Sequence, residues 1–208
     1  IFRDGNNPSA VEFIEKEAVD WVVKYEYLTL QINPQAKAFL LIEVDGNDLD
    51  LLMNDCEKIS NVLMNYQAED ILFADSAQQK EDFWRMRRSI ALSVKANSIY
   101  KEEDTVVPRA ELAKLLKGVK AIGLKYGFQS VCYGHAGDSN LHVNILKNNL
   151  SDEQWNIEIP KAITEIFEHC KQVGGTISGE HGIGLVQKDY LPGKSITLSI
   201  QFFSYSSS

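Results

Sequence analysis

Two glycine-rich stretches of this 208-residue chain, 132–145 and 174–184, contain the residues best suited to chemistry. Together they hold three of its four histidines, and Glu180 stands next to one of them. Glycine lets the backbone turn tightly and approach a ligand closely, so glycines beside titratable side chains indicate a binding site. Two histidines and one carboxylate form a ligand set for zinc, manganese, iron or cobalt. We therefore predict a divalent metal site at His135, His142 and Glu180; the alternative is that these histidines only hydrogen-bond within a turn.

The first stretch has the pattern of a β-hairpin. Two short runs rich in β-forming residues, 131–133 and 141–145, flank a polar turn that suits a longer hairpin loop. In such a hairpin His135 and His142 meet at its mouth. Side chains alternate along a strand, so Asn144 shares the polar face of His142 while the apolar residues between them face the core.

The first third of the chain is predicted to form a helix and a strand–helix–strand unit. Ser9 is a good N-cap and Glu12 follows at the capping-box spacing, so a helix should begin there and expose its acidic side chains to solvent. The apolar run 38–44 is typical of a central strand. The helical periodicity of 49–66 and the short apolar run 71–74 complete a unit found in ferredoxin-like domains.

The remaining elements follow from periodicity and from residues that end helices. We expect helices at 78–94, at 109–126 and from 151 to 173, and a strand at 104–107. Gly127 fits the C-terminal cap of the second helix, and Pro160 should interrupt or restart the third. His169 lies off the apolar stripe of that helix, so we expect it on the surface. The elements together predict one α+β domain with an antiparallel sheet and helices packed on one face.

Composition narrows the class of protein. A hydrophobic fraction of 44% and a charged fraction of 24% are ordinary for a globular domain. The net charge of −8 and the pI near 5.0 argue against nucleic acid or an anionic membrane surface as a partner. No apolar run is long enough to span a bilayer. The three cysteines are odd in number and far apart, which favours a reducing, cytoplasmic setting.

The two glycine-rich stretches resemble the C-terminal domain of the FAD-linked oxidases. They spell Gly-His-x-Gly-Asp-x-Asn-Leu-His-x-Asn and Gly-Gly-x-Ile-Ser-Gly-Glu-His-Gly-Ile-Gly, and the resemblance extends from about Pro8 to about Leu191. That family includes D-lactate dehydrogenases, the flavin subunit of glycolate oxidase and D-2-hydroxyglutarate dehydrogenase. The resemblance implies a duplicated ferredoxin-like antiparallel sheet that caps a separate FAD-binding domain.

This resemblance sets the expected domain organisation. Residues 1–194 are assigned to the C-terminal domain, and the uncharged run 195–208 departs from the usual family ending, so it is treated as an atypical tail. The chain starts at Ile1 and lacks the N-terminal FAD-binding domain, so we expect it to be a piece of a longer protein. Alone it should bind FAD weakly or not at all and should not turn over.

The resemblance also implies roles for individual residues. Three arginines crowd the helix at 78–94 and could simply be a solvated basic face, but the family's Trp-x-x-Arg motif matches Trp84 to Arg87. Arg87 is therefore expected to bind the substrate carboxylate through its bidentate fork. His181 is expected to be the general base, with Asn144 hydrogen-bonding the substrate near the metal.

The chain departs from the family pattern at a few positions. Ser139 stands where the family usually has glycine, and would be strained if the backbone φ there is positive. Members that act on D-2-hydroxyglutarate have a threonine where this chain has Ala91. They also have a lysine where it has Glu102, although Lys101 is one step away. A second substrate carboxylate would lose these partners, which weakens 2-hydroxyglutarate as the substrate.

The expected function is that of the substrate- and metal-binding domain of a flavin-dependent D-2-hydroxy acid dehydrogenase, of D-lactate or glycolate type. Hydride would pass from C2 of the substrate to FAD, with zinc, manganese or iron as the metal. The expected partners are the FAD-binding domain of the parent protein and an iron–sulfur electron-acceptor subunit, which would place a cytoplasmic protein at the membrane periphery. Two alternatives are a redox-inactive ferredoxin-like binding module with a metal or anion pocket, and metal-dependent hydrolysis.

Overall fold

The computed structural model describes residues 1–28, 32–68, 70–179, 181–182 and 190. The predicted metal ligand Glu180 and the tail 195–208 lie outside these residues, so the predictions made for them stay predictions. Among the described helices, none is long and apolar enough to cross a membrane.

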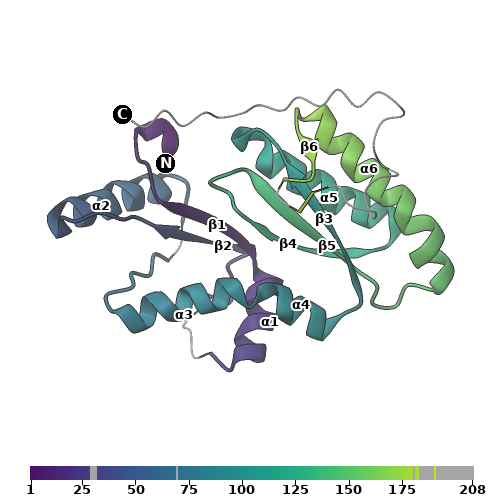
Figure 1. The fold of residues 1–208 in the computed structure, drawn as a ribbon, viewed down its shortest axis with the longest axis horizontal. Coiled ribbons are helices and arrows are strands. Elements are labelled where there is room, and N and C mark those ends of the chain that lie inside the picture. The colour runs from purple at the N-terminus through teal and green to yellow at the C-terminus, as the bar shows by residue number, and fades with distance from the viewer. Residues whose placement is uncertain (29–31, 69, 180, 183–189, 191–208) are drawn as a thin grey trace.

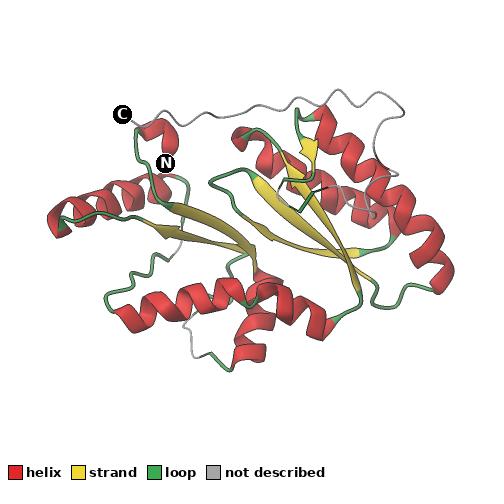
Figure 2. Cartoon of the chain, viewed as in Figure 1, coloured by secondary structure: helices red, strands yellow, loops and turns green. Residues whose placement is uncertain are grey.

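Six strands form one open antiparallel sheet in the order β2-β1-β4-β5-β3-β6, accompanied by six α-helices (Figures 1 and 2). The strands are β1 (Ala10–Glu15), β2 (Ala38–Glu43), β3 (Tyr100–Val106), β4 (Gln129–Gly134), β5 (Asn140–Leu146) and β6 (Thr176–Ile177). The helices are α1 (Lys16–Glu26), α2 (Leu49–Asn65), α3 (Ala77–Arg88), α4 (Ile90–Asn97), α5 (Leu112–Tyr126) and α6 (Ile159–Gln172). This arrangement confirms the predicted α+β class with an antiparallel sheet.

The second half of the chain follows the order β3-α5-β4-β5-α6-β6. Strands β3 and β4 run in the same direction with the antiparallel β5 between them, and β3 likewise separates β5 from β6. This is the split arrangement of ferredoxin-like units. The described part of the first half adds only β1 and β2 to the sheet, so it does not repeat the unit in full.

Helices cover both faces of the sheet, not one face as predicted. Cys132 and Tyr133 are neighbours on β4 and point to opposite faces. Cys132 belongs to the core formed with α5 and α6, whereas Tyr133 belongs to the core formed with α1 and α4. The alternation of apolar and polar residues along β5 favours a sheet covered on one face, but its polar residues His142 and Asn144 are buried as well.

The predicted helix at Ser9 is wrong in its first turn and a half. Residues 10–15 form β1, which pairs with β2 along its length and with β4 at Phe13 and Ile14, and the helix begins only at Lys16. The hydroxyl of Ser9 bonds the carbonyl oxygen of Glu43 at 3.0 Å instead of capping a helix. Pairing with two neighbouring strands outweighs the local capping signal. As a result Glu12 is buried, where solvent exposure was predicted.

Other boundaries differ in smaller ways. The run 38–44 forms β2 at the edge of the sheet, not at its centre, and 71–74 forms no strand. The stretch predicted as one helix at 78–94 is divided at Ser89 into α3 and α4, although its buried stripe continues across the break. The cap at Gly127 is confirmed by its φ of +77°. His169 is only partly exposed, because its ring lies against Gly118.

Candidate metal and substrate site

The predicted hairpin forms and brings His135 and His142 together. Strands β4 and β5 pair from Gln129↔Leu146 to Tyr133↔His142, and the ring centroids of the two histidines are 5.9 Å apart. Gly134 leaves room for the hairpin to close, since an added Cβ would lie 2.4 Å from the carbonyl oxygen of Asn140. His142 is 4% exposed, so it projects from the middle of the sheet into the protein.

The turn of this hairpin contains the strained position suspected from the sequence. Ser139 has a φ of +64° and is buried. The left-handed region costs a non-glycine residue roughly 1–2 kcal/mol, which glycine at this position would avoid. The turn nevertheless closes with hydrogen bonds from the backbone N–H groups of Asp138 and Asn140 to the carbonyl oxygen of His135.

The second glycine-rich stretch places His181 beside His142. Their rings are nearly parallel, with centroids 5.1 Å apart and an interplanar angle of 19°. Asp104, 1% exposed on β3, holds the segment in place: its carbonyl accepts the N–H of Ser178 at 2.8 Å, and its Oδ2 accepts the N–H of His181 at 3.1 Å. The sequence placed Asp104 in a predicted strand but gave it no role.

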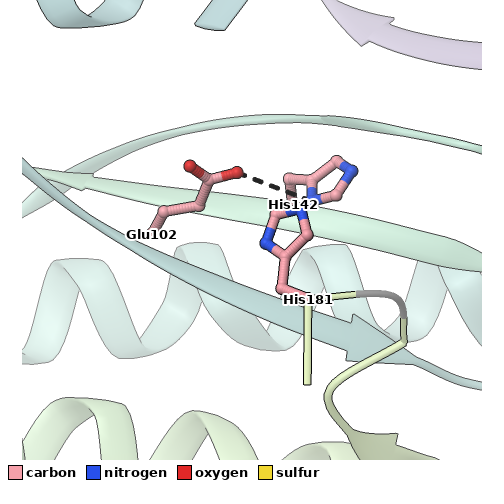
Figure 3. A group of neighbouring side chains, drawn as sticks. All are labelled: Glu102, His142 and His181. Carbon is pink, nitrogen blue, oxygen red and sulfur yellow. Dashed lines mark ion pairs between the residues drawn. The ribbon is translucent and has the colours of Figure 1, made fainter. Parts of the chain in front are cut away.

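Glu102 is a third member of this cluster and was not predicted as a site residue. Figure 3 shows its carboxylate pointing toward His142, and the distance from Glu102 Oε1 to His142 Nδ1 is 3.6 Å. Its position follows from strand register, because Glu102 pairs with Asn144 and lies on the same face. Lys101 faces the opposite side and lies over the ring of Trp155, so it cannot replace the family's lysine.

Arg87 reaches the same site from helix α3. Its Nε donates a hydrogen bond to Glu12 Oε2 at 2.7 Å, and its guanidinium carbon is 5.3 Å from the ring centroid of Tyr133. The Arg87 side chain is 11% exposed. The other two arginines of α3, Arg85 and Arg88, form exposed ion pairs within the helix, as a solvated basic face would. Arg87 differs from these two arginines because its side chain is largely buried.

Asn144 is fully buried next to this cluster, as its predicted place on the His142 face requires. Neither its side-chain oxygen nor its nitrogen has a hydrogen-bond partner among the described residues. The Tyr133 hydroxyl approaches the amide without reaching hydrogen-bond geometry. Burial, and then the negative charge of Glu102, raise the pKa of Tyr133 well above its usual value, so it stays a protonated donor. A buried amide without a partner is costly, which suits a site completed by a ligand.

Comparison with known proteins decides the family. The family described as FAD linked oxidases, C-terminal domain, matches residues 1–197. The chain belongs to this family. It is 33% identical over 191 residues to a D-lactate dehydrogenase of Anaerostipes hadrus, covering 88% of this chain and 40% of that protein. It is 35% identical over 191 residues to the glycolate oxidase subunit GlcD of Bacillus subtilis (strain 168), covering 88% and 38%.

A third relative is a probable mitochondrial D-2-hydroxyglutarate dehydrogenase of Oryza sativa subsp. indica, 32% identical over 190 residues, with 87% of this chain and 32% of that protein covered. The chain therefore spans two fifths or less of the length of these relatives. Membership of the FAD-linked oxidases implies FAD as cofactor and relates the chain to oxidoreductases that act on 2-hydroxy acids.

In this FAD-linked oxidase domain, the clustered side chains fit a divalent metal ion. Ligand atoms of Glu102, His142 and His181 all lie within 4.8 Å of one another. His135, whose ring centroid is 5.9 Å from that of His142, has its Nδ1 2.8 Å from Glu12 Oε1, and a carboxylate on one ring nitrogen is typical of a histidine that binds metal through the other. There are thus two candidate ligand sets: the set seen in the structure adds His181 and Glu102 to His142, and the set predicted from the sequence adds His135 and Glu180, of which Glu180 lies outside the described residues. His142 is common to both.

Replacing Asp104 by asparagine should loosen His181. The carboxylate accepts from both Asn140 Nδ2, at 2.5 Å, and the N–H of His181, and an amide offers only one acceptor for these two donors. We expect a loss of about 1–3 kcal/mol in the free energy of unfolding, the cost of one unsatisfied buried group, with faster amide exchange at His181. Urea unfolding measures the free energy of unfolding, and hydrogen exchange measures the protection of the His181 amide.

Asp138→Asn is the control, because it makes the same change at an exposed position of the hairpin turn. It should alter neither the free energy of unfolding nor the exchange rate at His181. Unchanged exchange at His181 in Asp104→Asn would contradict the anchoring role.

Proposed function

We propose that this chain is the substrate- and metal-binding region of an FAD-dependent D-2-hydroxy acid dehydrogenase, of D-lactate or glycolate type. The observation that supports it best is the meeting of His135, His142, His181 and Arg87 on one face of the sheet, in a member of a family whose relatives carry these names. FAD would be bound mainly by a separate domain of the same parent protein. An iron–sulfur subunit is the proposed electron acceptor.

Each group of the chain has a distinct proposed task. His135, His142 and Glu180 hold the metal, and Arg87 binds the substrate carboxylate through its terminal nitrogens. Asn144 hydrogen-bonds the substrate, which would give its buried amide a partner. When bound, the metal lowers the pKa of the substrate hydroxyl and FAD accepts the hydride. His181 removes the hydroxyl proton as general base, and the hydrogen bond from its backbone to Asp104 holds it in position.

Anaerobic flavin reduction tests this function directly. The chain joined to the FAD-binding region of its parent, loaded with zinc or manganese, should show rapid reduction of the flavin by D-lactate or glycolate. L-lactate should be a poor substrate, and chelation of the metal should abolish the reaction. A protein that binds metal but never reduces flavin with any 2-hydroxy acid would favour the redox-inactive binding module instead.

The position of Glu102 favours a substrate with a single carboxylate. Its carboxylate lies 3.6 Å from Nδ1 of the proposed metal ligand His142. A second substrate carboxylate placed there would meet a like charge instead of a lysine, and juxtaposed like charges cost several kcal/mol. The proposed substrate therefore carries only a small neutral group, or only hydrogen, as the remaining substituent on C2.

Replacing Glu102 by lysine should shift this selectivity. We expect the ratio of kcat/KM for D-2-hydroxyglutarate to that for D-lactate to rise by roughly 10-fold or more, since about 1.4 kcal/mol of removed repulsion corresponds to a factor of ten. Steady-state kinetics on both substrates, with metal content checked, measure it. Glu102→Gln removes the charge without adding the opposite one and should give an intermediate ratio. An unchanged ratio in a lysine variant that retains its metal would exclude Glu102 as a selectivity residue.

A further inference from the structure

Glu12 connects the proposed metal ligand His135 with the proposed substrate residue Arg87. It lies on β1, is 5% exposed, and uses both carboxylate oxygens. Oε1 is 2.8 Å from His135 Nδ1, and Oε2 accepts a hydrogen bond from Arg87 Nε at 2.7 Å. Burying a carboxylate is costly unless it is paired and hydrogen-bonded, and here each oxygen has a charged or titratable partner.

The contact with His135 selects one form of its ring. A carboxylate only accepts hydrogen bonds, so the proton of a neutral His135 must be on Nδ1. The lone pair is then on Nε2, which is the form that binds a metal through that nitrogen. Without the carboxylate the proton could move to Nε2 and block coordination. Glu12 therefore selects the metal-binding tautomer before any metal arrives.

The contact of Glu12 with Arg87 orients the guanidinium group of the arginine. Glu12 holds Nε, and the ring of Tyr133 lies beside the guanidinium plane, with 5.3 Å between its centroid and the guanidinium carbon. Among the described residues, neither terminal nitrogen of Arg87 has a hydrogen-bond partner, and these two nitrogens are the pair that binds a planar carboxylate. A single side chain thus sets the spacing between the metal ligand and the anchor for the substrate carboxylate.

We propose that Glu12 is a positioning residue that makes His135 ready to bind metal and holds Arg87 beside it. The inference rests on the proposed function and deepens it, because metal affinity and carboxylate binding become linked through one buried carboxylate. Sequence analysis placed Glu12 on the solvent face of a helix; its burial on β1 is what gives it this role.

Glu12→Gln is the decisive variant, and Glu15→Gln is its matched control. If the glutamine oxygen accepts from Arg87, its NH₂ group faces His135 Nδ1 and forces the proton onto Nε2. Glu15 lies three residues along the same strand, is equally buried at 7%, and accepts from Lys120 Nζ and the N–H of Cys132, both at 2.7 Å. It faces the opposite side of the sheet, so its loss should cost stability without affecting the metal site.

Two measurements on the 208-residue chain test the proposal. Titration with Co²⁺, followed by its visible absorption, should show that Glu12→Gln weakens binding roughly 10–100-fold, the usual effect of losing the carboxylate behind a metal-binding histidine. Glu15→Gln should bind as the wild type does. In the metal-free chain, long-range ¹H–¹⁵N correlation spectra should show His135 as the Nδ1–H tautomer in the wild type and as the Nε2–H tautomer in Glu12→Gln.

The outcomes separate this proposal from the proposed function. An Nε2–H tautomer of His135 in the wild type would overturn it even if the Glu12→Gln protein does not fold. Equal Co²⁺ affinity in Glu12→Gln and the wild type, or equal weakening in Glu12→Gln and Glu15→Gln, would also overturn it while leaving the metal site standing. A wild-type chain that binds no Co²⁺ would overturn both the metal site and the role of Glu12.

Discussion

Replacing His181 by alanine in the complete flavoenzyme should slow flavin reduction by roughly 10²–10⁴-fold, the range typical of losing a general base. The metal content and the flavin spectrum should stay unchanged. The physical reason is that the two residues have different proposed tasks: Glu180 neutralises charge as the third ligand, and His181 accepts the proton of the substrate hydroxyl. Because the ring of His181 lies beside that of His142, the base sits next to the metal without having to bind it. Single-turnover stopped-flow reduction and elemental analysis make the two measurements.

Three comparison variants make this result interpretable. His169→Ala removes the one histidine that lies against Gly118, outside the site, and should change neither rate nor metal. His135→Ala and Glu180→Ala should lose the metal together with the rate. If His181→Ala loses the metal while His135→Ala keeps it, the ligand set is Glu102, His142 and His181, and the general base must be sought elsewhere.

His142→Ala should abolish metal binding altogether. The ring centroid of His142 is 5.9 Å from that of His135 and 5.1 Å from that of His181, and His142 belongs to both candidate ligand sets. A single remaining histidine and one carboxylate leave too few protein ligands for a tight divalent site. Elemental analysis of protein refolded with zinc or manganese should give about one ion per chain for the wild type and none for the variant.

Loss of folding must be separated from loss of a ligand in this experiment. His142 is 4% exposed, so its truncation also leaves a cavity and lowers the free energy of unfolding. Unfolding measured for both metal-free proteins gives that contribution alone. The wild type should then gain stability on adding metal and His142→Ala should not, because only a folded protein that binds the ion is stabilised by it. Stoichiometric metal in the variant would contradict the assignment of His142 in both sets.

The sequence by itself predicted the parts of the site that depend on local signals. Alternation along 141–145 was enough to place His142 and Asn144 on one face, and the polar turn before it was enough to predict the hairpin. The periodicity of 109–126 and the glycine after it predicted α5 and its end. Ser139 was recognised as a position of backbone strain, and its φ of +64° confirms it. Each of these signals depends on residues within a few positions of one another, so it can be read from the sequence alone.

Tertiary structure alone decided which strands neighbour one another. Residues 10–15 carry a capping-box signal for a helix, yet pairing with β2 and β4 makes them a strand and turns Glu12 into the buried partner of Arg87, 75 residues away. Local propensity contributes fractions of a kcal/mol per residue, which strand pairing and burial readily exceed. The same pairing made β2 an edge strand although its sequence is as apolar as that of a central one.

Register decided the rest of the site. Adjacent residues of a strand point to opposite faces, so the pairing of β3 with β5 directs Glu102 and Asp104 into the cluster and sends Lys101 to the other side. The sequence shows one lysine followed by three acidic residues at 101–104, but it does not state which of them meets His142. That choice depends on hydrogen bonds between strands about 40 residues apart, which no local pattern encodes.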